Sequence, residues 1–156
     1  MPTKRILIRL MTSNLNQYFV PWTDRRVMVH HTPLQILVVD DNVNAAEALA
    51  AYLTFECMEC RVAFGGRDAI LMATTAVPHA IVMDISMPEC TGFEAALALR
   101  HDQRTRGIVI IAFTALDESE VRRHAIDHEF DGYCQKGQSP AHLVTLILAL
   151  THRTQP

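Results

Sequence analysis

Five residues that could do chemistry together each follow a short apolar run of the sequence. Asp40 and Asp41 follow the first run and Asp84 the third, while Thr114 follows the fourth and Lys136 lies just past the fifth. Three carboxylates in one crevice repel one another unless a cation lies beside them, and an all-oxygen set of ligands suits magnesium better than zinc. The hydroxyl and the ammonium are donors suited to phosphate oxygens. The set therefore predicts a site for Mg²⁺ and a phosphoryl group.

The elements that must position these residues alternate regularly along the chain. Short apolar runs, typical of strands covered on both faces, alternate with stretches whose apolar residues recur at helical spacing. This alternation predicts an α/β fold with a parallel doubly wound sheet and helices on both faces. The carboxyl ends of such strands meet at one edge, where ligands bind, so the acidic residues would gather there. The expected strands are 35–39, 59–63, 79–83, 107–113 and 130–134.

The expected helices follow these strands and show recognisable start signals. Asn42 can cap the first helix, and Asp117 followed three residues later by Glu120 resembles a capping box. Ser139 followed by Pro140 suits the start of the last helix. We place the start of the domain at Leu34 and its end just after the last helix. The domain then covers residues 34–152 and is followed by a tail, residues 153–156.

Residues 1–33 differ from the rest of the chain. They show no sustained periodicity, and residues 1–34 hold five basic residues against one acidic residue. We expect a basic N-terminal extension that is disordered, or that reflects a start site upstream of the true one at Met28. The remaining residues carry a negative net charge, which argues against binding of nucleic acid by the domain itself.

Composition limits the class of protein. The chain has 156 residues, of which 49% are hydrophobic and 20% are charged, as in a single globular domain. No apolar run approaches the roughly 18 to 20 residues that span a bilayer, so we expect a cytoplasmic protein with no membrane partner. Cys57 and Cys60 have the spacing of a metal-binding pair, but no second such pair supplies the other ligands of a zinc site.

Several motifs together resemble the receiver domain of two-component signalling, with the same order and separations over about residues 34–151. The resemblance implies a flavodoxin-like fold with five parallel strands in the order 2-1-3-4-5. The matching motifs are ILVVDD at 36–41, MDISMP at 83–88, Gly92, FTA at 113–115, GY at 132–133 and Lys136.

The resemblance also implies roles for the acidic residues. Asp84 matches the phosphoacceptor, a carboxylate that takes a phosphoryl group from a histidine kinase or a histidine phosphotransfer protein. The domain would then be a signalling phosphoacceptor rather than an enzyme acting on other substrates. Asp41 matches the direct Mg²⁺ ligand and Asp40 its neighbour, while Asp84 and the backbone carbonyl of Ser86 would complete the metal site.

Three later residues match the parts of a receiver that respond to phosphorylation. Thr114 and Lys136 match the residues that grip the phosphoryl oxygens. Tyr133 matches an aromatic switch that turns inward when the threonine moves. The resemblance places the signalling surface, where a downstream protein binds, on the fourth helix, the fifth strand and the fifth helix.

Three alternative functions compete with this interpretation. Phosphatases of the haloacid dehalogenase type have a second Asp two residues after the nucleophilic Asp. This chain has Ser86 at that position, so the acid is missing. A flavin-binding module would need a phosphate-cradling first loop, where Asp40 and Asp41 would repel phosphate. A degenerate receiver would act as a protein-binding module without phosphorylation. Gly137, where the family usually has proline, favours it weakly, and the complete acidic set argues against it.

Overall fold

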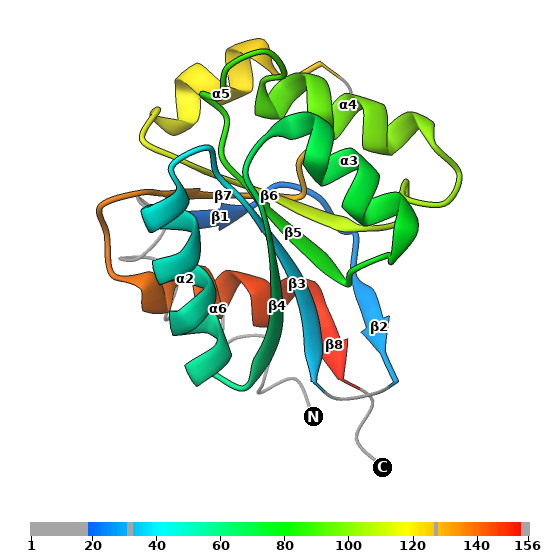
Figure 1. Cartoon of the computed structure of the whole chain (residues 1–156), viewed down its shortest axis with the longest axis vertical. Coiled ribbons are helices and arrows are strands. Elements are labelled where there is room, and N and C mark those ends of the chain that lie inside the picture. The colour runs from blue at the N-terminus through cyan, green and yellow to red at the C-terminus, as the bar shows by residue number, and fades with distance from the viewer. Residues whose placement is uncertain (1–18, 31–32, 127, 154–156) are drawn as a thin grey trace, which may run out of the picture.

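The computed structural model describes residues 19–30, 33–126 and 128–153 of the chain. Within these residues, none of the helices combines the length and the apolar character needed to cross a bilayer. Strands and helices alternate through most of the described sequence (Figure 1). The elements are β1 (Phe19–Pro21), β2 (Val27–Val29), β3 (Leu34–Val39), α2 (Val43–Phe55), β4 (Met58–Ala63), α3 (Gly66–Thr75), β5 (Ala80–Met83), α4 (Gly92–His101), β6 (Val109–Thr114), α5 (Glu118–His124), β7 (Gly132–Gln135), α6 (Pro140–Leu150) and β8 (Thr151–Arg153).

The central sheet has six strands in the order β1-β7-β6-β5-β3-β4. Its five parallel strands follow the order 2-1-3-4-5 of their succession in the domain, which is the order that the resemblance to receiver domains implied. All four residues of β5 are buried, which explains why this strand has no alternation of polar and apolar residues. The sixth strand, β1, was not predicted and pairs antiparallel with β7 at one edge.

Two apolar layers lie on the two faces of the sheet. Helices α2 and α6 cover one face, and α3, α4 and α5 cover the other (Figure 1). The first layer includes Leu53 from α2 and Leu146 from α6. The second includes Ala73 from α3, Leu99 from α4 and Val121 from α5. The helices therefore bury their apolar stripes against both faces, as a doubly wound fold requires.

The helix starts agree with the capping residues in the sequence. The side chains of Asn42 and Asp117 accept hydrogen bonds from backbone amides in the first turns of α2 and α5. Ser139 caps α6 and is followed by Pro140, whose fixed φ suits the first helical position. Thr91 caps α4 and forms a capping box with Glu94.

Residues 19–30, which we call the strap, form the strands β1 and β2. The prediction that the N-terminal extension is disordered is therefore wrong for this segment. Here β1 joins the edge strand β7 and β2 pairs in parallel with β8, so both segments have backbone partners. The physical reason is that an open sheet edge offers unpaired backbone groups to any segment that can reach it. Residues 1–18 lie outside the described residues, as do 154–156 of the predicted tail.

Candidate functional site

The acidic residues lie at one edge of the sheet, just past the carboxyl ends of two neighbouring strands. Val39 of β3 and Met83 of β5 are register partners, and each is followed directly by an aspartate. The backbone amide of Asp84 donates a hydrogen bond to the carbonyl oxygen of Val39 at 2.9 Å. This pairing brings Asp40 and Asp84 side by side, and Asp41 follows at the start of the same loop.

The three aspartates form a cluster that suits a hard cation. One carboxylate oxygen from each of Asp40, Asp41 and Asp84 lies within 4.8 Å of the other two. Asp40 and Asp84 are 5% and 6% exposed, while Asp41 faces solvent. The oxygen-only ligand set and the solvent-facing side fit Mg²⁺, which retains several waters when it binds.

Lys136 brings a positive charge to the same cluster. Its Nζ lies 2.6 Å from Oδ2 of Asp40 and 3.4 Å from Oδ2 of Asp84. Its backbone amide donates to the carbonyl oxygen of Thr114 at 2.8 Å, which fixes the loop after β7 beside the end of β6. Part of the negative charge of the two buried carboxylates is therefore balanced within the chain.

The environment of Asp84 changes its affinity for protons. Burial raises the pKa of Asp84 above its usual value, and the negative charge of Asp40 raises it further. The Lys136 ammonium opposes this shift, as does a hydrogen bond from the backbone amide of Ile85 to Asp84 Oδ1 at 2.8 Å. Burial is the largest of these effects, so the pKa stays raised.

Thr114 and Tyr133 are both buried and are linked through the backbone of Leu116. The amide of Leu116 donates to Thr114 Oγ1 at 3.3 Å, and the Tyr133 hydroxyl donates to the carbonyl oxygen of Leu116 at 2.7 Å. Burial raises the pKa of Tyr133 to about 12, which keeps the hydroxyl protonated as a donor. Tyr133 is only 1% exposed, and the ring of Trp22 stacks on it with centroids 5.9 Å apart.

The remaining motif residues lie around the cluster. Ser86 is exposed and lies two residues after Asp84. Gly92 packs so closely that an added Cβ would lie 2.2 Å from the carbonyl oxygen of Asp84. Gly137 has a φ of +85°, a left-handed conformation that glycine adopts without strain. Proline, whose φ is fixed at about −65°, could not adopt the conformation found at this position.

A second buried carboxylate, on Asp131, was not recognised in the sequence. It is fully buried and lies 2.9 Å from Arg25 Nε and 2.6 Å from an Arg100 guanidinium nitrogen. It also accepts hydrogen bonds from the Thr23 hydroxyl and the Ile110 amide. A single Asp within an apolar run carries no signal for such partners, since they come from distant parts of the chain. Asp131 joins the strap to the domain.

Comparison with known proteins agrees with the fold and the motifs. Residues 36–148 match the response regulator receiver domain family. The chain is 32% identical over 124 residues to the response regulator MprA of Mycolicibacterium vanbaalenii, covering 80% of this chain and 53% of that protein. It is 32% identical over 121 residues to the phosphate regulon transcriptional regulatory protein PhoB of Pseudomonas aeruginosa, covering 78% and 53%. The chain thus spans about half the length of the curated relatives it matches.

Solved structures give the same fold. The chemotaxis protein CheY4 of Vibrio cholerae superposes with a TM-score of 0.72 at 24% identity, over 76% of this chain and 99% of that one. The response regulator TrrA of Thermotoga maritima, in complex with Mg²⁺ and BeF, superposes with a TM-score of 0.68 at 27% identity, over 76% and 99%.

Fold and site together define a doubly wound α/β domain with an acidic cluster at the carboxyl edge of its sheet. The chain belongs to the response regulator receiver domain family.

Proposed function

We propose that this chain takes a phosphoryl group onto Asp84 and changes its surface in response. The observation that carries the proposal is the surroundings of the Asp84 carboxylate. It lies within 4.8 Å of oxygens from Asp40 and Asp41 and 3.4 Å from the Lys136 ammonium. Carboxylates that repel one another beside a fixed cationic side chain suit a site where a metal and a phosphoryl group bind together.

In the proposed reaction, a carboxylate oxygen of Asp84 attacks the phosphorus of a phosphohistidine on a partner protein. A new O–P bond forms, the P–N bond breaks, and the leaving imidazole nitrogen retains the electron pair and takes up a proton. The donor would be a histidine kinase or a histidine phosphotransfer protein. The Lys136 ammonium balances negative charge on the phosphoryl oxygens, which requires it to turn from Asp40 towards Asp84.

Asp40, Asp41 and Asp84, with the backbone carbonyl of Ser86, would hold Mg²⁺ at this edge of the sheet. The bound ion would neutralise charge on the attacking carboxylate and the phosphoryl group. Asp41 is the carboxylate open to solvent, so it is the best placed to meet a hydrated ion as it arrives.

The proposed response begins with Thr114 and reaches the surface formed by α5, β7 and α6. These are the fourth helix, the fifth parallel strand and the fifth helix of the domain, and we call this the proposed signalling surface. A new phosphoryl group attracts the Thr114 hydroxyl as a hydrogen-bond donor. This movement disturbs the bond between Thr114 and the Leu116 amide, and Leu116 in turn holds the Tyr133 hydroxyl. A downstream protein would read the altered surface.

Acetyl phosphate with Mg²⁺, followed by intact mass, tests the proposed phosphorylation. The wild-type chain should gain one phosphoryl group, and Asp84→Asn should gain none. Asp68→Asn, which removes an exposed carboxylate at the start of α3, should behave as the wild type. A phosphorylated Asp84→Asn variant would refute the assignment, and a wild-type chain that gains nothing would favour the phosphorylation-independent binding module.

A further inference from the structure

Trp22, the only tryptophan of the chain, lies in the strap and against two elements of the proposed signalling surface. Its ring stacks on that of Tyr133 in β7, with centroids 5.9 Å apart and an interplanar angle of 4°. Its indole Nε1 donates to Oε1 of Glu118 in α5 at 2.9 Å. One side chain from the N-terminal segment thus joins α5 to β7.

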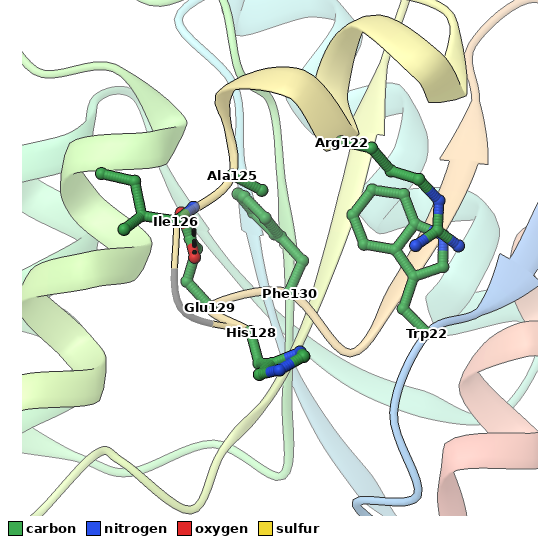
Figure 2. Close-up of a pocket in the computed structure, with 7 residues that line it drawn as sticks. All are labelled: Trp22, Arg122, Ala125, Ile126, His128, Glu129 and Phe130. Carbon is green, nitrogen blue, oxygen red and sulfur yellow. Dashed lines mark hydrogen bonds between the residues drawn. The ribbon is translucent and has the colours of Figure 1, made fainter.

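Arg122 closes this arrangement from the side of α5. Its guanidinium carbon lies 4.2 Å from the centroid of the Trp22 ring, and its Nε lies 2.9 Å from the same Glu118 oxygen that accepts from the indole. Figure 2 shows the Arg122 guanidinium lying across the Trp22 ring, beside a pocket of about 210 Å³ next to Phe130. The indole is therefore held by α5 through both its polar edge and its face.

The strap is fixed on both sides of Trp22, but the contacts of Trp22 with α5 are open to solvent. Before it, β1 pairs with β7, and after it Thr23 and Arg25 contact the fully buried Asp131 at 2.7 and 2.9 Å. By contrast, the Glu118 and Arg122 side chains are 31% and 52% exposed. Solvated contacts of this kind are weak, so the indole can leave α5 while the strap stays in place.

A continuous set of contacts connects the acidic cluster to this indole. Leu116 bonds the Thr114 hydroxyl through its amide and the Tyr133 hydroxyl through its carbonyl. Leu116 is also two residues before Glu118, the first residue of α5. A movement of Thr114 therefore reaches both partners of Trp22, the Tyr133 ring and α5, through one residue.

We propose that Trp22 is a latch that holds α5 against β7 while Asp84 is unphosphorylated and that opens on phosphorylation. The inference rests on the proposed function, because it needs Thr114 to move towards a phosphoryl group. Once Leu116 and the start of α5 shift, the indole cannot keep both its stack on Tyr133 and its hydrogen bond to Glu118. Opening uncovers the part of the α5–β7–α6 surface that the Trp22 side chain covers, while the rest of the strap stays in place. A partner protein therefore gains access to this part only in the phosphorylated form.

Intrinsic fluorescence tests the latch in the wild-type chain, because all tryptophan emission comes from position 22. Mg²⁺ and beryllofluoride, an acyl-phosphate mimic, should shift the emission to the red and raise the acrylamide quenching constant about twofold, since the indole moves towards solvent. Bound beryllofluoride is followed in the same samples by fluorine NMR. Bound beryllofluoride with unchanged emission would overturn the latch alone. Absence of binding would count against the proposed function and the latch together.

Trp22→Ala gives a second test, because a contact made only in the resting state opposes binding of the mimic. By linkage, its removal should lower the half-saturating beryllofluoride concentration about fivefold. Arg26→Ala is the matched control and should bind as the wild type. Among the residues that the structure describes, the Arg26 side chain donates to the carbonyl oxygens of Thr23 and Arg25, both within the strap. Equal affinities of Trp22→Ala and wild type would contradict the latch. Trp22→Phe, which retains a ring but no N–H, should give an intermediate affinity.

Discussion

The ammonium nitrogen of Lys136 lies 2.6 Å from a carboxylate oxygen of Asp40, well within hydrogen-bonding distance. In this resting arrangement the lysine is bound mainly to the acid that follows β3, and less closely to the proposed phosphoacceptor at 3.4 Å. The same side chain therefore stabilises the acidic cluster before phosphorylation and is close enough to reach a phosphoryl group afterwards.

Lys136→Met should destabilise the fold when no divalent cation is present. The change leaves the buried carboxylates of Asp40 and Asp84 without their cation, and we expect a loss of about 1 to 3 kcal/mol in the free energy of unfolding. Urea denaturation in EDTA measures this loss, and millimolar Mg²⁺ should recover part of it. Arg104→Met removes an exposed partner of Asp102 and serves as the control, with little change expected. A Lys136→Met variant as stable as the wild type in EDTA would contradict this balance of charges.

The raised pKa of Asp84 predicts a dependence of stability on pH. A carboxyl group whose pKa is higher in the folded than in the unfolded state binds more protons when folded, so stability falls as pH rises from the unfolded to the folded pKa. Asp84→Asn removes the free-energy cost of ionising this buried carboxyl group in the folded state. The variant should therefore melt at a higher temperature than the wild type at pH 7 in EDTA. The advantage should disappear below about pH 4, where the wild-type carboxyl is protonated in both states. Thermal melts of Asp68→Asn should show neither effect.

Asp131→Asn should be the most destabilising of these single changes. Asp131 is fully buried against Arg100, whose side chain is 9% exposed, and loss of its charge leaves that guanidinium unpaired. We expect about 3 to 5 kcal/mol of destabilisation in urea. Asp102→Asn, on an exposed ion pair, should change little. Similar urea midpoints for the two variants would show that the buried ion pair contributes no more to the free energy of unfolding than the surface pair does.

Gly92→Ala should disturb the site through its backbone. The added methyl group would meet the carbonyl oxygen of Asp84 at 2.2 Å, so α4 or the strand end must move, with a cost of about 1 to 3 kcal/mol. Phosphorylation by acetyl phosphate should slow because the carboxylate is displaced. Gly65→Ala is the control, as an added Cβ there meets nothing within 4 Å. Wild-type rates and stability in Gly92→Ala would refute the close contact.

Most of the central sheet could be predicted because β3, β5 and β6 are short, largely apolar runs and because each of the five parallel strands is followed by a helix. In β5 every residue is buried, and the acid at its end is easily recognised. The strap could not be predicted, because β1 and β2 have only three residues each and no periodicity of their own. Their structure depends on pairing with β7 and β8 far along the chain.

The acidic cluster was also open to prediction, whereas the surroundings of Tyr133 were not. The positions of Asp40, Asp41 and Asp84 depend on strand ends, which the sequence marks clearly. The burial of Tyr133 depends on Trp22, which belongs to a segment without any pattern that would place it on β7. A charged residue such as Asp131 likewise gives no sign of burial until its arginine partners are seen in space.

Chemical mapping of the phosphorylated residue tests the central claim most directly, because it needs no variant. The wild-type chain is incubated with acetyl phosphate and Mg²⁺, the acyl phosphate is reduced with borohydride, and the peptides are sequenced by mass spectrometry. Reduction converts a phosphoaspartate to homoserine, so the modified position is read from the sequence. We predict homoserine at position 84 and unmodified aspartate at positions 40 and 41. Homoserine at position 40 or 41, or none at position 84 in a chain that gained a phosphoryl group, would contradict the account.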